Sequence, residues 1–170
     1  MSASKHFRPP RGPAQKPPRP PSDVSFAGPT DLDALLLFLA DVREEIDGGR
    51  VEDILIADFA RDLVNRIGGV ALIVRGAGGI EASLGLRAEH PLFSRAHYLR
   101  AVWNVVAPEA RLTGHARSLL VEGRKFADSL GRQLLIEELT PDMAGGKTKL
   151  VARHLRPVGT LFRYDPAAVA

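Results

Sequence analysis

The sequence of 170 residues contains no cysteine. This absence excludes disulfide bonds, zinc–thiolate sites, iron–sulfur clusters and cysteine nucleophiles, and it is typical of proteins kept in a reducing compartment. No apolar run approaches the roughly 20 residues that a membrane-spanning helix needs. Prolines and cations interrupt the N-terminal segment, so it lacks the apolar core of a signal peptide. We therefore expect a soluble, cytoplasmic protein with no membrane partner.

Acidic residues are absent from residues 1–22, which hold five cations and seven of the thirteen prolines. The segment carries +5, whereas the other 148 residues carry 18 cations against 20 carboxylates, a net charge of −2. Such a composition predicts an extended, disordered arm that precedes one globular domain over residues 23–170. We interpret the arm as a solvated tail. The alternative is a docking arm for nucleic acid or for a protein partner.

Apolar periodicity and Gly/Pro punctuation predict the order of elements in the globular part. Two of the expected strands form a hairpin around the four residues 76–79. The second helix is expected to bury one apolar stripe, made of Ile54, Ala57, Ala60, Leu63, Val64 and Ile67. The order predicts a mixed α/β fold, with strands at 23–27, 70–75, 80–86, 98–106, 133–139 and 158–164, and helices from 30 to 48, 51–67, 115–130 and 143–153.

The most informative stretch is the end of the strand at Val106 and the helix that opens at Gly114. Backbone N–H groups in the first turn of a helix lack acceptors, and the helix dipole favours negative charge there. A pyrophosphate fits such a site if side chains leave room for it. Gly114 and the small Ala116 provide that room, and Arg111 adds positive charge.

This stretch resembles motif A of the GCN5-related N-acetyltransferases (GNATs), in which Arg/Gln-x-x-Gly-x-Gly/Ala follows a Val-x-Pro strand end. Val106, Pro108, Arg111, Gly114 and Ala116 match the pattern. The resemblance implies the GNAT fold, a mostly antiparallel mixed sheet with a splayed central strand pair and flanking helices.

The resemblance also implies a ligand, acetyl-CoA or another acyl-CoA, and no metal. Main-chain groups of Asn104, Val105 and Val106 would pair with pantetheine. The N–H groups of the following loop would hold the pyrophosphate; its residues are Arg111, Leu112, Thr113, Gly114, His115 and Ala116.

The reaction that the resemblance implies is acyl transfer to an amine, which needs a base and an acid. Leu150 stands where the family often has a tyrosine acid, and Arg100 stands where it often has a glutamate base. His97 and Glu138 are the candidate catalytic residues, with Glu137 as a neighbour of the second. The acceptor is an amine-bearing small molecule or protein.

Two functions remain open at this stage. The first is an active N-acyltransferase that works by direct attack in a ternary complex. The second is a catalytically inactive GNAT-fold component of a larger assembly, docked through its N-terminal arm. A C-terminal edge strand would also permit pairing into a homodimer.

Overall fold

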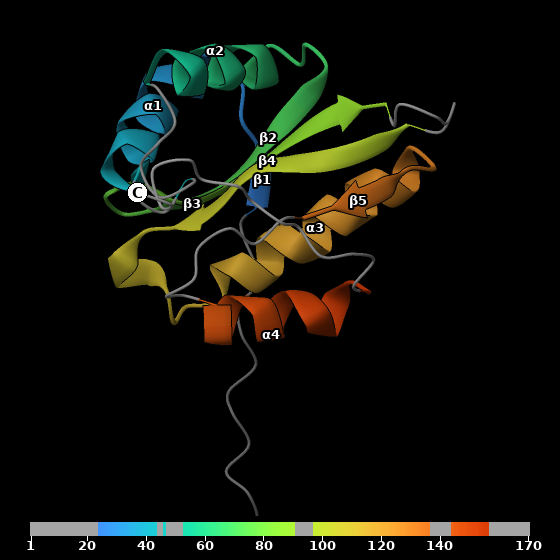
Figure 1. Ribbon diagram of the computed structural model, residues 1–170. Coiled ribbons are helices and arrows are strands. Elements are labelled where there is room, and N and C mark those ends of the chain that lie inside the picture. Colours follow the sequence, from blue (N-terminus) through green and yellow to red (C-terminus); the bar gives the residue numbers. More distant parts are fainter. Residues whose placement is uncertain (1–23, 44–45, 47–52, 91–96, 137–143, 157–170) are drawn as a thin grey trace, which may run out of the picture.

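The computed structural model describes residues 24–43, 46, 53–90, 97–136 and 144–156. The described chain forms a sheet between two pairs of helices (Figure 1). Short 3-10 turns precede α1 and follow β4. The elements are β1 (Val24–Phe26), η1 (Pro29–Asp31), α1 (Leu32–Asp41), α2 (Asp53–Val64), β2 (Gly69–Gly76), β3 (Gly79–Glu89), β4 (Tyr98–Val106), η4 (Pro108–Ala110), α3 (His115–Ser129), β5 (Gln133–Leu135) and α4 (Ala144–His154).

The five strands lie in chain order, β1-β2-β3-β4-β5. The first three pairings are antiparallel and the β4–β5 pairing is parallel. The parallel pair is reached through α3, which is the connection that a parallel pair requires. The predicted hairpin at 76–79 is confirmed, and so is the mixed, mostly antiparallel sheet with flanking helices.

Each face of the sheet has its own apolar core, because side chains alternate between the faces along a strand. On β2, Ala71 and Ile73 join the core under α1 and α2. Val70, Leu72 and Val74 join the core under α3. Figure 1 shows α1 and α2 on one side of the sheet and α3 with α4 on the other. The two layers fix the position of β4 from both sides.

The buried stripe of α2 differs from the predicted one. Ile56, Ala60, Leu63 and Val64 are the buried residues of this helix. Ile54 is 65% exposed, and Ile67 is 60% exposed because the helix ends at Val64. The prediction is therefore confirmed for Ala60, Leu63 and Val64 and wrong for Ile54 and Ile67, and Ile56 is buried in place of Ile54.

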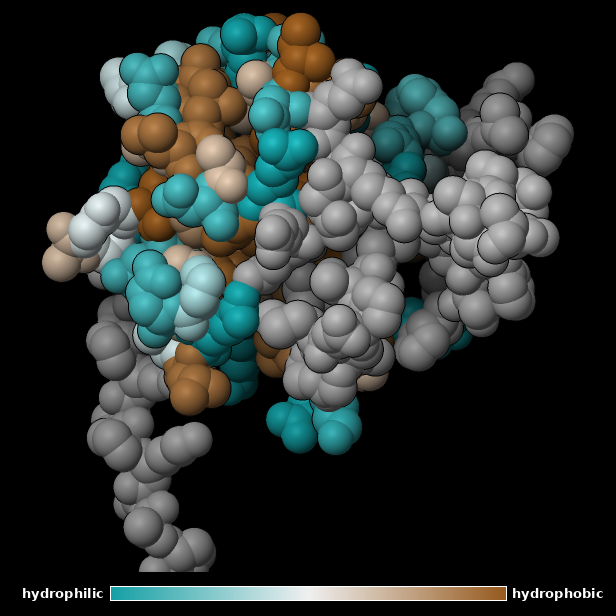
Figure 2. Space-filling view, turned by 60° about the vertical axis from the view of Figure 1, so that its left-hand side comes forward, coloured by the Kyte–Doolittle hydropathy of each residue, from teal (hydrophilic) through white to brown (hydrophobic). Residues whose placement is uncertain are grey.

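Apolar side chains also lie on the outer surface of the first helix pair. Leu37 of α1 and Leu55 of α2 are exposed, together with Ile54. Figure 2 shows apolar surface gathered over these helices. No helix in the described part of the chain is long and apolar enough to cross a membrane. The predicted strand at 158–164 and the N-terminal arm lie outside the described residues.

Candidate acyl-CoA site

The central strand β4 carries a bulge in its middle. Gly85 of β3 pairs with Trp103 of β4, and the next residue of β3, Leu86, pairs with Ala101. Val102 is therefore the extra residue on β4, and no β3 residue lies opposite it. Bulges interrupt the regular ladder and are common beside active sites.

The side chain of Trp103 holds the bulge in place. Its Nε1–H donates to Ser83 Oγ at 2.9 Å, and the Ser83 hydroxyl donates to the Leu72 carbonyl at 3.1 Å. The indole also covers Gly85, where a Cβ atom would lie 2.6 Å from the ring. This network is buried, so the β4 backbone on either side of Val102 is fixed relative to β3.

The other edge of β4 pairs with β5 over only three residues. Tyr98, Leu99 and Arg100 pair with Gln133, Leu134 and Leu135. Ile136 follows β5 without a strand pairing. Within the described residues, the β4–β5 pairing therefore ends at Arg100 and Leu135, and residues 137–143 lie outside the described part of the chain. A pairing this short agrees with the splayed strand pair that the resemblance implied.

A tight turn connects the end of β4 with α3. The Ala110 N–H donates to the Ala107 carbonyl at 2.9 Å, and the Thr113 hydroxyl donates to the Ala110 carbonyl at 2.6 Å. Gly114 then adopts φ 95° and ψ 9°, a left-handed conformation that glycine adopts without a side-chain clash. No side chain caps α3 at this residue. The N–H groups of the first turn are thus left to a ligand or to solvent.

Asn104 is a buried polar residue near the end of β4. It is 8% exposed, and its Oδ1 atom has no hydrogen-bond partner among the described residues. Its neighbours on β4, Trp103 and Val105, belong to the core under α1 and α2. Alternation along the strand places Asn104 on the α3 face. A buried acceptor without a donor is costly, and a bound water or a ligand can supply the missing donor. An amide-containing chain in the β4–β5 opening fits this requirement.

The predicted phosphate-loop residues lie together at the N-terminus of α3, but they differ in what they offer. Leu112 is 95% exposed and Arg111 is exposed. The Thr113 N–H already donates to the Ala110 carbonyl at 3.1 Å. His115 turns its ring toward β3, where Nε2 lies 2.9 Å from Glu81 Oε2. The backbone N–H groups from Gly114 onward are therefore the best placed for an anion.

The candidate base His97 lies at the opposite end of β4. It precedes the strand, is exposed, and contacts His90, with ring centroids 3.7 Å apart and ring planes tilted by 57°. At about 3.3 Å per residue, it lies about 13 Å before Ala101, the first β4 residue after those paired with β5. The pKa of His97 is lowered by partial desolvation, then by the positive charges of His90 and Arg132. These effects favour the neutral form of the ring, which can accept a proton.

The other positions considered for catalysis do not provide a base or an acid in the described part of the chain. Glu138 and its neighbour Glu137 lie outside the described residues. Arg100 forms an ion pair with Glu89, with Nη1 3.6 Å from Oε2. The Tyr98 hydroxyl donates to the same Glu89 Oε2 at 3.1 Å. Among the described residues, no three His, Asp or Glu side chains meet as metal ligands.

Two features of the site were not predicted from the sequence. The bulge at Val102 has a weak signal, since a glycine inside a strand, here Gly85, often marks one. The contact of Glu81 with His115 has none, because 34 residues separate the pair. Only the register of β3 against β4 brings the two together.

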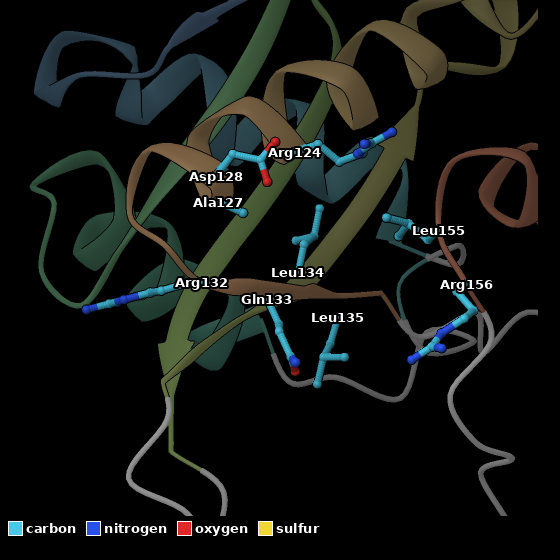
Figure 3. Close-up of a pocket in the computed structure, with 9 residues that line it drawn as sticks. All are labelled: Arg124, Ala127, Asp128, Arg132, Gln133, Leu134, Leu135, Leu155 and Arg156. Atoms are coloured by element: carbon cyan, nitrogen blue, oxygen red, sulfur yellow. The ribbon is translucent and has the colours of Figure 1, made fainter.

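A separate cavity of about 360 Å³ lies at the far end of α3, between β5 and the end of α4. Figure 3 shows Leu134 pointing toward α3, and Arg132 extending away from the other lining residues. Arg124 points in a different direction again. The guanidinium groups of Arg124 and Arg132 do not converge on one point, so this cavity suits an anion less well than the start of α3 does.

No protein-family model matches the chain, and no curated protein matches it in sequence. Solved structures do match its fold. The structure of AAC(6')-Iy in complex with the bisubstrate analogue CoA-S-monomethyl-acetylneamine has a TM-score of 0.66 and 14% identity, covering 84% of this chain and 96% of its own.

Two further matches have similar coverage. A Trypanosoma brucei acetyltransferase has a TM-score of 0.61 and 20% identity, covering 84% of this chain and 98% of its own. A GNAT family acetyltransferase of Staphylococcus aureus has a TM-score of 0.58 and 13% identity, covering 83% and 96%. At these identities the likeness is one of fold. The chain has the fold of the GNAT acetyltransferases.

Proposed function

We propose that this chain binds an acyl-CoA between β4 and β5 and transfers the acyl group to an amine. The observation that carries the proposal is the start of α3, where Gly114 is left-handed and no side chain caps the helix. Beside it on β4, the buried Asn104 Oδ1 has no hydrogen-bond partner among the described residues. One of the matched structures holds a CoA-containing bisubstrate analogue. This likeness supports a CoA ligand for the opening.

The residues present fit such a ligand. The N–H groups at the start of α3 suit the pyrophosphate, and the exposed Arg111 and Arg117 add positive charge nearby. Asn104 Oδ1 suits an amide N–H of the pantetheine arm, because it is buried without a partner among the described residues. Main-chain groups of β4 from Ala101 to Val106 would pair with the same arm.

The proposed reaction is direct acyl transfer. The amine nitrogen attacks the thioester carbonyl carbon, a C–N bond forms, the C–S bond breaks, and the thiolate takes up a proton. The bulge at Val102 interrupts the β3 ladder, and donors at such a point can stabilise the developing oxyanion. His97 is the proposed base. At about 13 Å from the opening, it would receive the proton through intervening water.

A second candidate is acyl-CoA binding without catalysis, and a specific observation favours it. Arg100, at the position of the usual glutamate base, forms an ion pair with Glu89 and is paired with β5. Its cationic side chain cannot act as a base. The two candidates share the ligand and differ only in turnover.

Isothermal titration calorimetry of the full chain with acetyl-CoA tests the shared part. Binding of one molecule per chain is expected, at a micromolar Kd. Absence of heat with acetyl-CoA and with a longer acyl-CoA would overturn both candidates. An assay for free thiol release, run with small amines and with peptides, then separates them. Thiol release that depends on the amine supports transfer, and binding without release supports the second candidate.

A further inference from the structure

Glu81 is the extra residue of a second bulge, at the start of β3. Val74 of β2 pairs with Ala82 and Arg75 pairs with Ile80, so Glu81 has no partner on β2. A bulge can redirect a side chain from the regular alternation of a strand. Here the Glu81 carboxylate reaches the first residue of α3, with Oε2 2.9 Å from His115 Nε2. An ionised carboxylate is only an acceptor, so Nε2 carries the proton.

The backbone of the same residue holds the other end of the turn. The Ala107 N–H donates to the Glu81 carbonyl at 2.8 Å. The turn from Ala107 to His115 therefore begins and ends on contacts to Glu81. No side chain caps α3 at Gly114. The contact between His115 and Glu81 therefore restrains the first residue of α3, where the N–H groups proposed to bind the anion begin.

The position of the carboxylate also depends on Gly76, the last residue of β2. A Cβ atom at this position would lie 1.6 Å from Glu81 Oε1 and 2.1 Å from Cδ. The Gly76 backbone has no positive φ, so alanine is compatible with its conformation. A methyl group there would displace the carboxylate while leaving the backbone of the hairpin acceptable.

The charge of Glu81 excludes a direct role in holding phosphate. A carboxylate close to the N-terminus of a helix competes with an anionic ligand for the same positive potential. Its side chain is 32% exposed and the His115 side chain is 21% exposed, so neither is a freely moving surface group. What the pair does provide is a contact between the first residue of α3 and β3.

We infer that Glu81 is a positioning residue for the pyrophosphate-binding turn, acting through His115 and dependent on the absence of a side chain at Gly76. The inference rests on the proposed acyl-CoA site and assigns part of its affinity to a residue outside the loop. It makes the β2–β3 hairpin a determinant of acyl-CoA binding.

Titration calorimetry of the full chain with acetyl-CoA tests this inference in a set of variants. Glu81→Ala and His115→Ala are each expected to weaken binding about tenfold, the effect of one hydrogen bond to a charged group. The double variant should bind no more weakly than the weaker single variant, because the two residues act as one unit. Glu81→Gln retains an acceptor for the His115 N–H and should bind within about threefold of the unaltered chain.

Gly76→Ala tests the role of the Glu81 carboxylate by a substitution on β2, outside the proposed binding turn. It should weaken binding about as much as Glu81→Ala in the unaltered chain. In the Glu81→Ala background it should have no further effect, since no carboxylate remains to be displaced. The matched control is Glu122→Ala, which breaks an exposed contact with Lys125 on the same helix. It should leave the affinity within about twofold.

Thermal unfolding without ligand identifies variants that have lost their fold. If Glu81→Ala does not fold, Glu81→Gln and Gly76→Ala still test the inference. Unchanged affinity in Glu81→Ala, or equal loss in Glu81→Gln and Glu81→Ala, would overturn the inference while leaving the proposed function intact. Absence of binding by the unaltered chain would instead overturn the proposed function, and the inference with it.

Discussion

Asn104 shows at the scale of one residue how stability and ligand binding can oppose each other. Its Oδ1 atom is buried without a donor among the described residues. Asn104→Leu replaces the amide by an apolar group of similar size. We expect the free energy of unfolding without ligand to rise by about 1 kcal/mol, because an unsatisfied buried acceptor is removed. Chemical denaturation of both proteins measures this change.

The same substitution should weaken acetyl-CoA binding, because the acceptor for the pantetheine amide is lost. A decrease of about five- to tenfold corresponds to one hydrogen bond. Asn104→Asp keeps an acceptor at the position and indicates how much of the loss is due to the missing oxygen. If Asn104→Leu is less stable than the unaltered chain and binds acetyl-CoA equally tightly, then Asn104 Oδ1 does not accept a hydrogen bond from the ligand.

The start of α3 gives a prediction at the scale of the element. Gly114 has φ 95°, and Gly131, just beyond the C-terminus of the same helix, has φ 61°. Alanine costs about 1 kcal/mol or more at either position, since both are left-handed. Gly114→Ala should also weaken acetyl-CoA binding. Alanine disfavours the left-handed conformation at this residue and so shifts the N–H groups that are proposed to hold the pyrophosphate.

Gly131→Ala is the matched control for this prediction. A Cβ atom there meets nothing within 4 Å, so the substitution carries the backbone cost alone. Both variants should lose similar stability in denaturant titrations, and only Gly114→Ala should lose affinity by calorimetry. Equal affinities in the two variants would place the ligand elsewhere.

Asp31 gives a prediction of pH dependence for the contact between η1 and β2. The Gly28 N–H donates to Oδ2 at 2.9 Å and Arg75 Nη2 donates to Oδ1 at 2.6 Å. These contacts, the Gly28 hydrogen bond first, lower the pKa of Asp31 in the folded chain. The stabilisation is therefore present above the pKa of the unfolded chain and is lost as pH falls through the lower folded value.

Asp31→Asn should accordingly reduce the free energy of unfolding by about 1–2 kcal/mol at pH 7, and by less as the pH falls through the lowered pKa of Asp31. Denaturant titrations across this range measure the difference. The exposed Asp41 provides the control, since Asp41→Asn should change stability by no more than about 0.5 kcal/mol at either pH. A difference between Asp31→Asn and the unaltered chain that grows toward low pH would contradict this account.

The elements were predictable from the sequence where local chemistry decides them. The hairpin around residues 76–79 and the helix from 115 to 129 depend on glycine positions and on apolar spacing, which act locally. The buried face of α2 was not predictable, because Ile54 and Ile56 are equally apolar. Their burial depends on how the helix rotates against the sheet.

In the candidate site, too, some features follow from the local sequence and others depend on how the strands pair. The turn and the start of α3 follow from Pro108, Gly114 and Ala116 in one continuous stretch. The bulges at Glu81 and Val102 depend on the register between strands, which the sequence specifies only through the whole sheet. The contact of Glu81 with His115 is a product of that register.

At the scale of the whole molecule, charge separates the N-terminal arm from the domain. Residues 1–22 carry +5 and the rest carries −2. Deleting residues 1–22 should lower the salt concentration needed to elute the protein from a cation exchanger, while acetyl-CoA affinity stays within about twofold. A tenfold loss of affinity on deletion would give the arm a part in the site.

The same deletion tests the docking alternative for the arm. If residues 1–22 bind nucleic acid, the full chain should show salt-dependent binding that the deleted chain lacks. Equal binding by the two chains, or by neither, would leave the arm as a solvated tail.

The most direct test of the central claim is a two-dimensional NMR titration of the full chain with acetyl-CoA. We expect the largest shifts at the backbone amides of residues 114–117, at β4 from Ala101 to Val106, and at the Asn104 side-chain amide. Little change is expected at the cavity beside Arg132. Shifts confined to that cavity, or no shifts at millimolar acetyl-CoA, would contradict the claim.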